Sequence, residues 1–194
     1  MTPASQKPAP DDPQAWKVLD SKYISKRPWL TVRQDCVQLP SGATIDEYYV
    51  LEYSEWINVL AITDDDYIVM VRQYRHPLQQ VYLELPGGVV DASDVNPEAA
   101  AKRELLEETG YGGGTWEHFM SLSANPSTHT NLTHSFLARS VVKLQEHAQE
   151  HTEDLRTHLL KLEEVQRIVL NGGIIQALHA APLLKYFLLR NTLK

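Results

Sequence analysis

The stretch that decides the fold of this chain is Arg103-Glu104-Leu105-Leu106-Glu107-Glu108-Thr109-Gly110. On a helix, Glu104 and Glu108 lie one turn apart and Glu107 lies between them in sequence, so the three carboxylates crowd one side. Like charges at this spacing destabilise an isolated helix, and a hard cation such as magnesium, which prefers oxygen ligands, is the natural compensation. The plain alternative is a solvated helix face, which is common on protein surfaces.

The residues around this stretch favour the metal site over the solvated face. A helix is predicted from about Pro97 to Thr109, because Asn96 is an acceptable N-cap, a proline suits the first helical position and Gly110 can close the C-terminus. A glycine turn at Pro86 to Gly88 precedes the helix and brings backbone carbonyls close to its carboxylates. The opposite helix face is apolar enough to dock on a sheet and consists of Ala99, Ala100, Leu105 and Leu106.

Residues Gly88 through Tyr111 resemble the Nudix box, whose pattern is Gly, five residues, Glu, seven residues, then Arg-Glu-apolar-x-Glu-Glu-x-Gly-apolar. The second half matches at every position, with Tyr111 as the apolar residue. In the first half, Asp94 stands where a Glu is expected, and eight residues rather than seven separate it from Arg103. The resemblance therefore implies an intact metal-binding half and a loop one residue longer, and it leaves the role of Asp94 open.

The resemblance extends beyond the box. Val71 to Arg75, followed by Leu83 to Gly88, is similar to the segment that leads into the box in ADP-ribose pyrophosphatases and related sugar-nucleotide hydrolases. The similarity covers roughly residues 16–190. It implies an α/β fold, namely the Nudix α/β/α sandwich with a mixed sheet and a small N-terminal antiparallel sheet. It also implies a homodimer whose N-terminal sheets exchange across the interface.

Alternation, apolar runs and turn residues predict the other elements. Strands are expected at Lys17–Ser25, Leu30–Leu39, Asp46–Glu52, Trp56–Thr63, Tyr67–Tyr74, Val81–Leu85, Trp116–Ser123, Thr133–Leu144 and Leu155–Leu162. Helices are expected at Leu162–Leu170 and Ile174–Arg190, and Pro182 lies inside the second. The pattern separates a disordered lead-in at 1–15, an N-terminal sheet at 16–53 and a domain at 54–194. The resemblance implies dimerisation and base contact for the sheet and identifies the last segment as the Nudix hydrolase domain.

The resemblance assigns roles to the box residues. Glu104 and Glu108 are expected as the principal magnesium ligands, with Glu107 alongside them as a ligand and catalytic carboxylate and the carbonyl of Gly87 completing the site. About two or three Mg²⁺ ions, with Mn²⁺ as an alternative, polarise the phosphoryl oxygens and activate a water for attack on phosphorus in such a site.

Substrate contacts are expected on both sides of the box. Arg75 and, less surely, Arg72 are expected to hold the diphosphate with a bidentate guanidinium, with Glu84 beside them, although a surface salt bridge is the alternative for the arginines. Trp29 and Tyr48 of the N-terminal sheet are expected to meet the nucleobase, and plain aromatic packing is their alternative.

Two later loops complete the expected site. The general base is expected on the loop 149–154, with Glu153 as the first choice and Glu150 as the second, although His151 and a plain solvated acidic loop remain alternatives. Pro126 lies about sixteen residues past the box, as in the ADP-ribose enzymes, and its loop is expected to reach the terminal sugar. That loop otherwise departs from the family pattern, since it carries Ser127, His129 and Asn131.

Composition limits the partners. The chain of 194 residues is 43% hydrophobic and carries a formal charge of -7 without a basic stripe, which argues against a nucleic-acid polymer as ligand. The single cysteine, Cys36, fits a reducing cytoplasm, and no apolar run suits a signal peptide or a membrane span.

The predicted function is magnesium-dependent hydrolysis of the pyrophosphate of a nucleoside diphosphate sugar. ADP-ribose is favoured, which would give AMP and ribose 5-phosphate, and another such sugar, for example GDP-mannose, is the alternative. A hydrolase of dinucleoside polyphosphates or damaged nucleoside triphosphates is a second rival. A non-catalytic sensor that binds ADP-ribose is a third, although the three box carboxylates argue against it.

Overall fold

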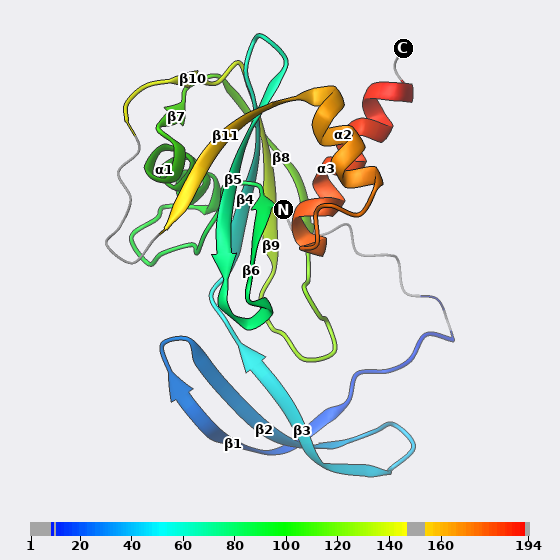
Figure 1. Cartoon of the computed structure of the whole chain (residues 1–194). Helices are drawn as coiled ribbons and strands as arrows, with labels where there is room; N and C mark the ends of the chain where they lie inside the picture. The colour runs from blue at the N-terminus through cyan, green and yellow to red at the C-terminus, as the bar shows by residue number, and fades with distance from the viewer. Residues whose placement is uncertain (1–8, 10, 147–153, 193–194) are drawn as a thin grey trace. The chain divides into compact units, whose positions relative to one another are not determined.

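The computed structural model describes residues 9, 11–146 and 154–192 (Figure 1). The chain divides into two compact units, Met1–Tyr53 with Asn125–Asn131, and Ser54–Ala124 with Leu132–Lys194. Most of the expected lead-in at 1–15 lies outside the described residues, so its disorder stays a prediction.

The larger unit contains one mixed sheet and three α-helices. Its main strands are β4 (Trp56–Ile62), β5 (Tyr67–Arg75), β6 (Gln80–Glu84), β8 (Thr115–Leu122), β9 (Thr133–Arg139) and β11 (Leu155–Lys161). The helices are α1 (Pro97–Thr109), α2 (Leu162–Leu170) and α3 (Ala177–Thr192), and a short 3₁₀ turn, η1 (His76–Leu78), joins β5 to β6. None of the helices in the described part of the chain is long and apolar enough to cross a membrane.

Successive residues of the central strands serve opposite faces of this sheet, as the strand period of two requires. Leu60 of β4 packs with α2 and α3, whereas its neighbour Val59 packs with α1. Figure 1 shows α1 on one side of the sheet and α2 and α3 on the other. The arrangement confirms the predicted α/β/α sandwich, with a buried core on each face.

One edge of β5 pairs with two different strands, β4 along one part and β6 along another, and this arrangement positions the site. The strand order is β11-β5-β4-β9-β8, in which only β4 and β9 are parallel along this path, and β6 also pairs with β5. β4 pairs with β5 only at Ala61 and Ile62, and further along β5 the strand β6 takes over from Val71 to Arg75. The chain that leaves β6 therefore runs beside the first half of β4, where Val59 N donates to Pro86 O at 2.9 Å.

The smaller unit is an antiparallel sheet of β1 (Lys17–Arg27), β2 (Leu30–Gln38) and β3 (Thr44–Glu52), in that order. This confirms the predicted N-terminal sheet. A turn at Pro40 to Gly42 joins β2 to β3, and Gly42 adopts a φ of 88°, a conformation that favours glycine. Nearly all of β1 is exposed.

Two element predictions differ from the structure. The expected strand Thr133–Leu144 is broken, because Ser140 has a φ of 58° and redirects the chain. The second part, β10 (Val142–Lys143), pairs instead with β7 (Tyr111–Gly112), a short strand that follows α1. The last helix begins at Ala177 rather than Ile174.

Candidate active site

Helix α1 is fixed at both ends by the residues that predicted it. The side chain of Asn96 accepts a hydrogen bond from Ala99 N at 2.9 Å, and Pro97 occupies the first turn. At the other end Gly110 has a φ of 74° and its N–H donates to Leu106 O at 2.8 Å. Ala100, Ala101 and Leu105 are buried against the sheet, so the carboxylates of Glu104, Glu107 and Glu108 are held on a rigid support.

The turn from Leu85 to Gly88 lies between this helix and β4. Gly87 N donates to Glu108 Oε2 at 2.9 Å, and Glu108 is only 5% exposed. A Cβ at Gly87 would stand 2.9 Å from Asn58 Cα, within the backbone of β4. A Cβ at Gly88 would stand 2.5 Å from the carboxyl carbon of Glu104. The lack of a side chain at Gly87 therefore lets the turn lie close to β4. The lack of a side chain at Gly88 lets it lie close to the carboxylate of Glu104.

Arg103 holds the charged side chains of the box together. Its Nη1 donates to Glu104 Oε1 at 2.9 Å and to Glu107 Oε2 at 3.1 Å, as the helical spacing predicts for the second pair. Its Nε and Nη2 donate to the two oxygens of Asp94 at 3.2 and 2.9 Å, and Nη2 also donates to Val89 O at 3.2 Å. The hydrogen bonds from Arg103 lower the pKa of Asp94, and those to Asp94 raise the pKa of Arg103.

This geometry gives Asp94 a role that the box pattern left open. Its side chain is 7% exposed and forms a two-point contact with Arg103, which in turn orients Glu104 and Glu107. The longer loop before α1 therefore returns to the carboxylate cluster and supports it.

The oxygen donors of this cluster fit a hard divalent cation. Pro86 O and Gly88 O accept hydrogen bonds from β4, whereas Gly87 O has no such donor among the described residues. Gly87 is also the residue whose N–H binds Glu108, so this carbonyl belongs to the part of the turn that contacts the helix. In the described part of the chain no group of three or more His, Cys, Asp or Glu side chains is placed so that it could hold a metal ion by itself. Mg²⁺ commonly uses one or two carboxylates and completes its shell with water and substrate phosphates, so an incomplete cage suits it.

Arg75 and Glu84 form a second charged group next to the turn. Arg75 Nε and Nη2 donate to the two oxygens of Glu84 at 3.0 and 2.5 Å. These hydrogen bonds raise the pKa of Arg75, and its side chain remains 45% exposed while that of Glu84 is 3% exposed. Arg72 lies three residues before Arg75 on the same strand, so the strand period directs it to the other face.

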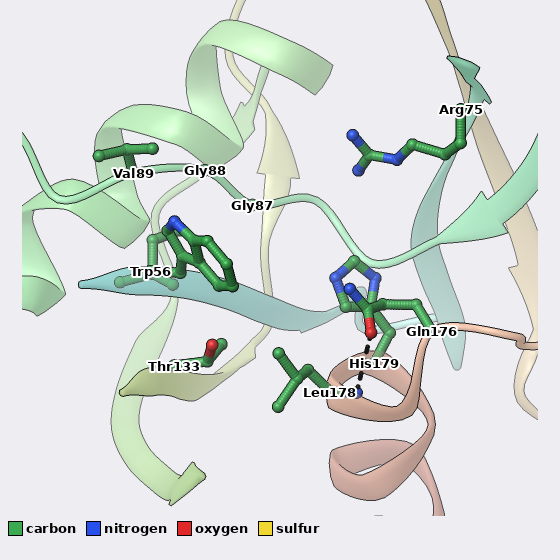
Figure 2. Close-up of a pocket in the computed structure, with 10 residues that line it drawn as sticks. Trp56, Arg75, Gly87, Gly88, Val89, Thr133, Gln176, Leu178 and His179 are labelled. Carbon is green, nitrogen blue, oxygen red and sulfur yellow. Dashed lines mark hydrogen bonds between the residues drawn. The ribbon is translucent and has the colours of Figure 1, made fainter. Parts of the chain in front are cut away.

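A cavity of about 360 Å³ opens beside the turn (Figure 2). The sequence predicted that Arg75 and Gly87 belong to the site, and both line this cavity. Several other residues that line the cavity were not predicted from the sequence. Those are Trp56, Thr133, Gln176, Leu178 and His179. A histidine inside an apolar helical pattern was the one available signal for His179, and it reads equally well as a core residue.

The remaining predicted residues fall elsewhere. Glu150 and Glu153 lie outside the described residues, so the general base stays a prediction. Trp29 belongs to the smaller unit and is 78% exposed. Tyr48 lies in the same unit, where its hydroxyl donates to Ser127 O at 2.5 Å and its ring meets Trp16 edge-on.

The loop that carries Pro126 also belongs to the smaller unit. Leu51 N donates to Thr128 O at 2.7 Å, and Thr130 N donates to Leu51 O at 3.1 Å, so the loop pairs with the end of β3. The rings of Tyr53 and His129 stack with centroids 5.4 Å apart. Pro126 itself is exposed.

Comparisons with known proteins follow the same division of the chain. A family model described as the NUDIX domain matches residues 56–179, and one described as the nucleoside diphosphate sugar hydrolase N-terminal domain matches residues 16–51. A methanol dehydrogenase activator of Bacillus methanolicus is 32% identical over 146 residues, which cover 75% of this chain and 77% of the relative.

An ADP-ribose pyrophosphatase of Mycobacterium tuberculosis is 28% identical over 170 residues, which cover 87% of this chain and 82% of the relative. The crystal structure of an ADP compounds hydrolase superimposes with a TM-score of 0.80 at 21% identity, over 94% of this chain and 96% of that chain. The structural likeness shows the shared fold.

Proposed function

Because this chain belongs to the Nudix hydrolase family, we propose that it hydrolyses the pyrophosphate bond of a nucleoside diphosphate sugar, with ADP-ribose as the leading substrate. The observation that carries the proposal is the contact of the glycine turn with both carboxylates, Gly87 with Glu108 and Gly88 with Glu104, on a turn that lines one cavity with Arg75. The matching N-terminal family model and the ADP-ribose pyrophosphatase relative support this substrate class.

The metal site is assigned to Glu104, Glu107, Glu108 and the carbonyl of Gly87. Nudix hydrolases generally need a divalent metal, and two or three Mg²⁺ or Mn²⁺ ions bound here supply Lewis-acid polarisation of the phosphoryl oxygens and an activated water. The hydrogen bond from Gly87 N to Glu108 keeps the turn and the helix in register. Arg103, held by Asp94, orients Glu104 and Glu107.

Arg75 is assigned to the diphosphate. Its guanidinium lines the cavity and is partly exposed, so it can contact phosphoryl oxygens while Glu84 fixes its position from below the surface. Glu84 therefore acts by positioning Arg75 rather than by touching substrate. Arg72 has no place in this assignment, because it lies on the other face of β5. The loop carboxylates Glu153 and Glu150 stay the first and second choices for the general base.

The smaller unit is assigned to dimerisation and base contact. Exposed apolar side chains lie along its sheet, and Trp29 is among the most exposed of them. An open sheet with these side chains gains stability when a second copy covers it. We assign the homodimer with exchanged sheets on this basis, with Trp29 and, more weakly, Tyr48 and Pro126 facing the nucleotide sugar.

The alternative substrate is another nucleoside diphosphate sugar, such as GDP-mannose. The loop of Pro126 favours this alternative, since Ser127, His129 and Asn131 stand where the ADP-ribose enzymes carry a different pattern. A panel of nucleoside diphosphate sugars incubated with and without Mg²⁺ tests the proposal. Cleavage only with Mg²⁺ supports it, whereas binding of ADP-ribose without cleavage of any sugar would support a sensor instead.

A further inference from the structure

His179 lies in the first turn of α3, next to the Leu85–Gly88 turn. Its neighbours Leu178 and Leu183 are buried in the core on the α2 and α3 side of the sheet, which fixes this end of the helix. Leu85 N donates to His179 Nδ1 at 3.1 Å, a contact between residues 94 positions apart. The imidazole is thus held against the start of the Leu85–Gly88 turn.

This hydrogen bond determines where the ring carries its proton. An amide N–H can only donate, so Nδ1 accepts and has no proton of its own. Burial lowers the pKa of His179 to about 4, against the opposing effect of Glu84, and Arg75 adds to the lowering. The ring is therefore neutral at pH 7, and its single proton is on Nε2.

The other ring nitrogen, Nε2, carries the single proton of the neutral ring. Among the residues that the structure describes, none accepts a hydrogen bond from it, and the ring lines the 360 Å³ cavity together with Arg75 and Gly87. Figure 2 shows the His179 ring beside Gln176, on the opposite side of the chain leading to Gly87 from Arg75. The side chain of His179 is 12% exposed, so the Nε2–H group can donate to a ligand atom that enters the cavity.

We propose that His179 is a substrate-binding residue that donates a hydrogen bond from Nε2–H to an oxygen of the substrate diphosphate. The inference rests on the proposed function and adds a contact from the C-terminal helix to it. A diphosphate oxygen is the fitting acceptor because it is negatively charged and because Arg75, assigned to the same group, lines the same cavity.

The surroundings favour a neutral donor over a second cation. Burial is the main reason that the imidazole stays neutral, because it disfavours the protonated form more than Glu84 favours it, and the positive charge of Arg75 adds a smaller effect in the same direction as burial. Glu84 Oε2 lies 4.0 Å from Nδ1 and accepts a hydrogen bond from Arg75. Its negative charge therefore lies on the Nδ1 side of the ring, and it accepts no hydrogen bond from Nε2–H. His179 can thus recognise an anion without titrating near neutral pH.

A pair of substitutions separates this contact from a purely structural one. The amide of asparagine falls near the position of Nδ1, whereas the amide of glutamine reaches the position of Nε2. His179→Asn therefore keeps the acceptor for Leu85 N and loses the donor in the cavity. His179→Gln keeps the donor and loses the acceptor.

We expect His179→Asn to lower kcat/KM for ADP-ribose by about ten- to a hundredfold with an unfolding midpoint near that of the wild type. His179→Gln is expected to stay within about threefold in kcat/KM and to unfold at a lower temperature. The non-cleavable diphosphate α,β-methylene-ADP, titrated by calorimetry, should bind more weakly to the asparagine variant only.

A larger loss of kcat/KM in His179→Gln than in His179→Asn would overturn the proposal, and so would equal losses in the two variants. In either case activity would depend on the hydrogen bond from Leu85 N rather than on the donor in the cavity. An inactive wild type counts against the proposed function, whereas an active wild type with an unaffected His179→Asn variant counts against His179 alone. The titration decides the contact even without turnover.

Discussion

The adjacent glycines of the turn give the sharpest prediction, since an added methyl group meets a strand at one and a carboxylate at the other. In Gly87→Ala the new Cβ would clash with Ile57 O and would stand 2.9 Å from Asn58 Cα, both backbone atoms of a buried strand. Overpacking of this kind costs about 1–3 kcal/mol. For a chain of this length, the unfolding midpoint should fall by about 2–12 °C.

In Gly88→Ala the atoms nearest to the added methyl group are those of the Glu104 carboxylate, at the end of a flexible side chain. The side chain can rotate away, so the stability cost should stay below about 1 kcal/mol. The rotation moves the Glu104 carboxylate away from its place beside the turn. A displacement of about 1 Å in a catalytic group can lower the rate by about a hundredfold. Gly88→Ala should therefore be folded and nearly inactive.

Thermal unfolding followed by circular dichroism, together with turnover of ADP-ribose in Mg²⁺, tests both variants. Each glycine serves as the control for the other, because the substitution is the same and the positions are adjacent. If Gly88→Ala lost as much stability as Gly87→Ala, or turned over like the wild type, the placement of Glu104 against the turn would be refuted.

Four further outcomes are expected. Glu108→Gln should lower turnover by at least about a hundredfold with little loss of folding, since it removes a charged oxygen donor, whereas Glu98→Gln on the same helix should resemble the wild type in a turnover assay. Arg103 lowers the pKa of Asp94 in the folded protein. Asp94 therefore stabilises the fold at pH values above its unfolded pKa of about 3.9, and this stabilisation is lost as the pH falls through the pKa of the folded state. Asp94→Asn should accordingly destabilise the protein at pH 7, and the difference from the wild type in urea unfolding should shrink below about pH 4. EDTA should abolish turnover and added Mg²⁺ should restore it. Sedimentation should show a dimer, and a monomer at micromolar concentration would count against exchanged sheets.

Local signals were sufficient for α1. Asn96, Pro97 and Gly110 act within one turn of the helix ends, so the sequence alone predicted both bounds. The strand period was also sufficient to separate Arg72 from Arg75, since residues three apart on a strand lie on opposite faces, although the sequence reading assigned both to the diphosphate.

Contacts between distant segments could not be predicted in the same way. His179 meets Leu85 across 94 positions, and its place in an apolar helix is typical of a core residue. The contact between Asp94 and Arg103 depends on the path of a loop whose length departs from the box pattern. Ser140 adopts a positive φ without being a glycine, so no turn residue indicated the break in its strand.

The most direct test of the central claim is mass spectrometry of the products of ADP-ribose hydrolysis in ¹⁸O-labelled water with Mg²⁺. We expect AMP and ribose 5-phosphate, with one solvent oxygen incorporated per cleavage, and no reaction without the metal. Release of ADP instead, or an intact substrate under conditions where it binds, would contradict pyrophosphate hydrolysis at this site.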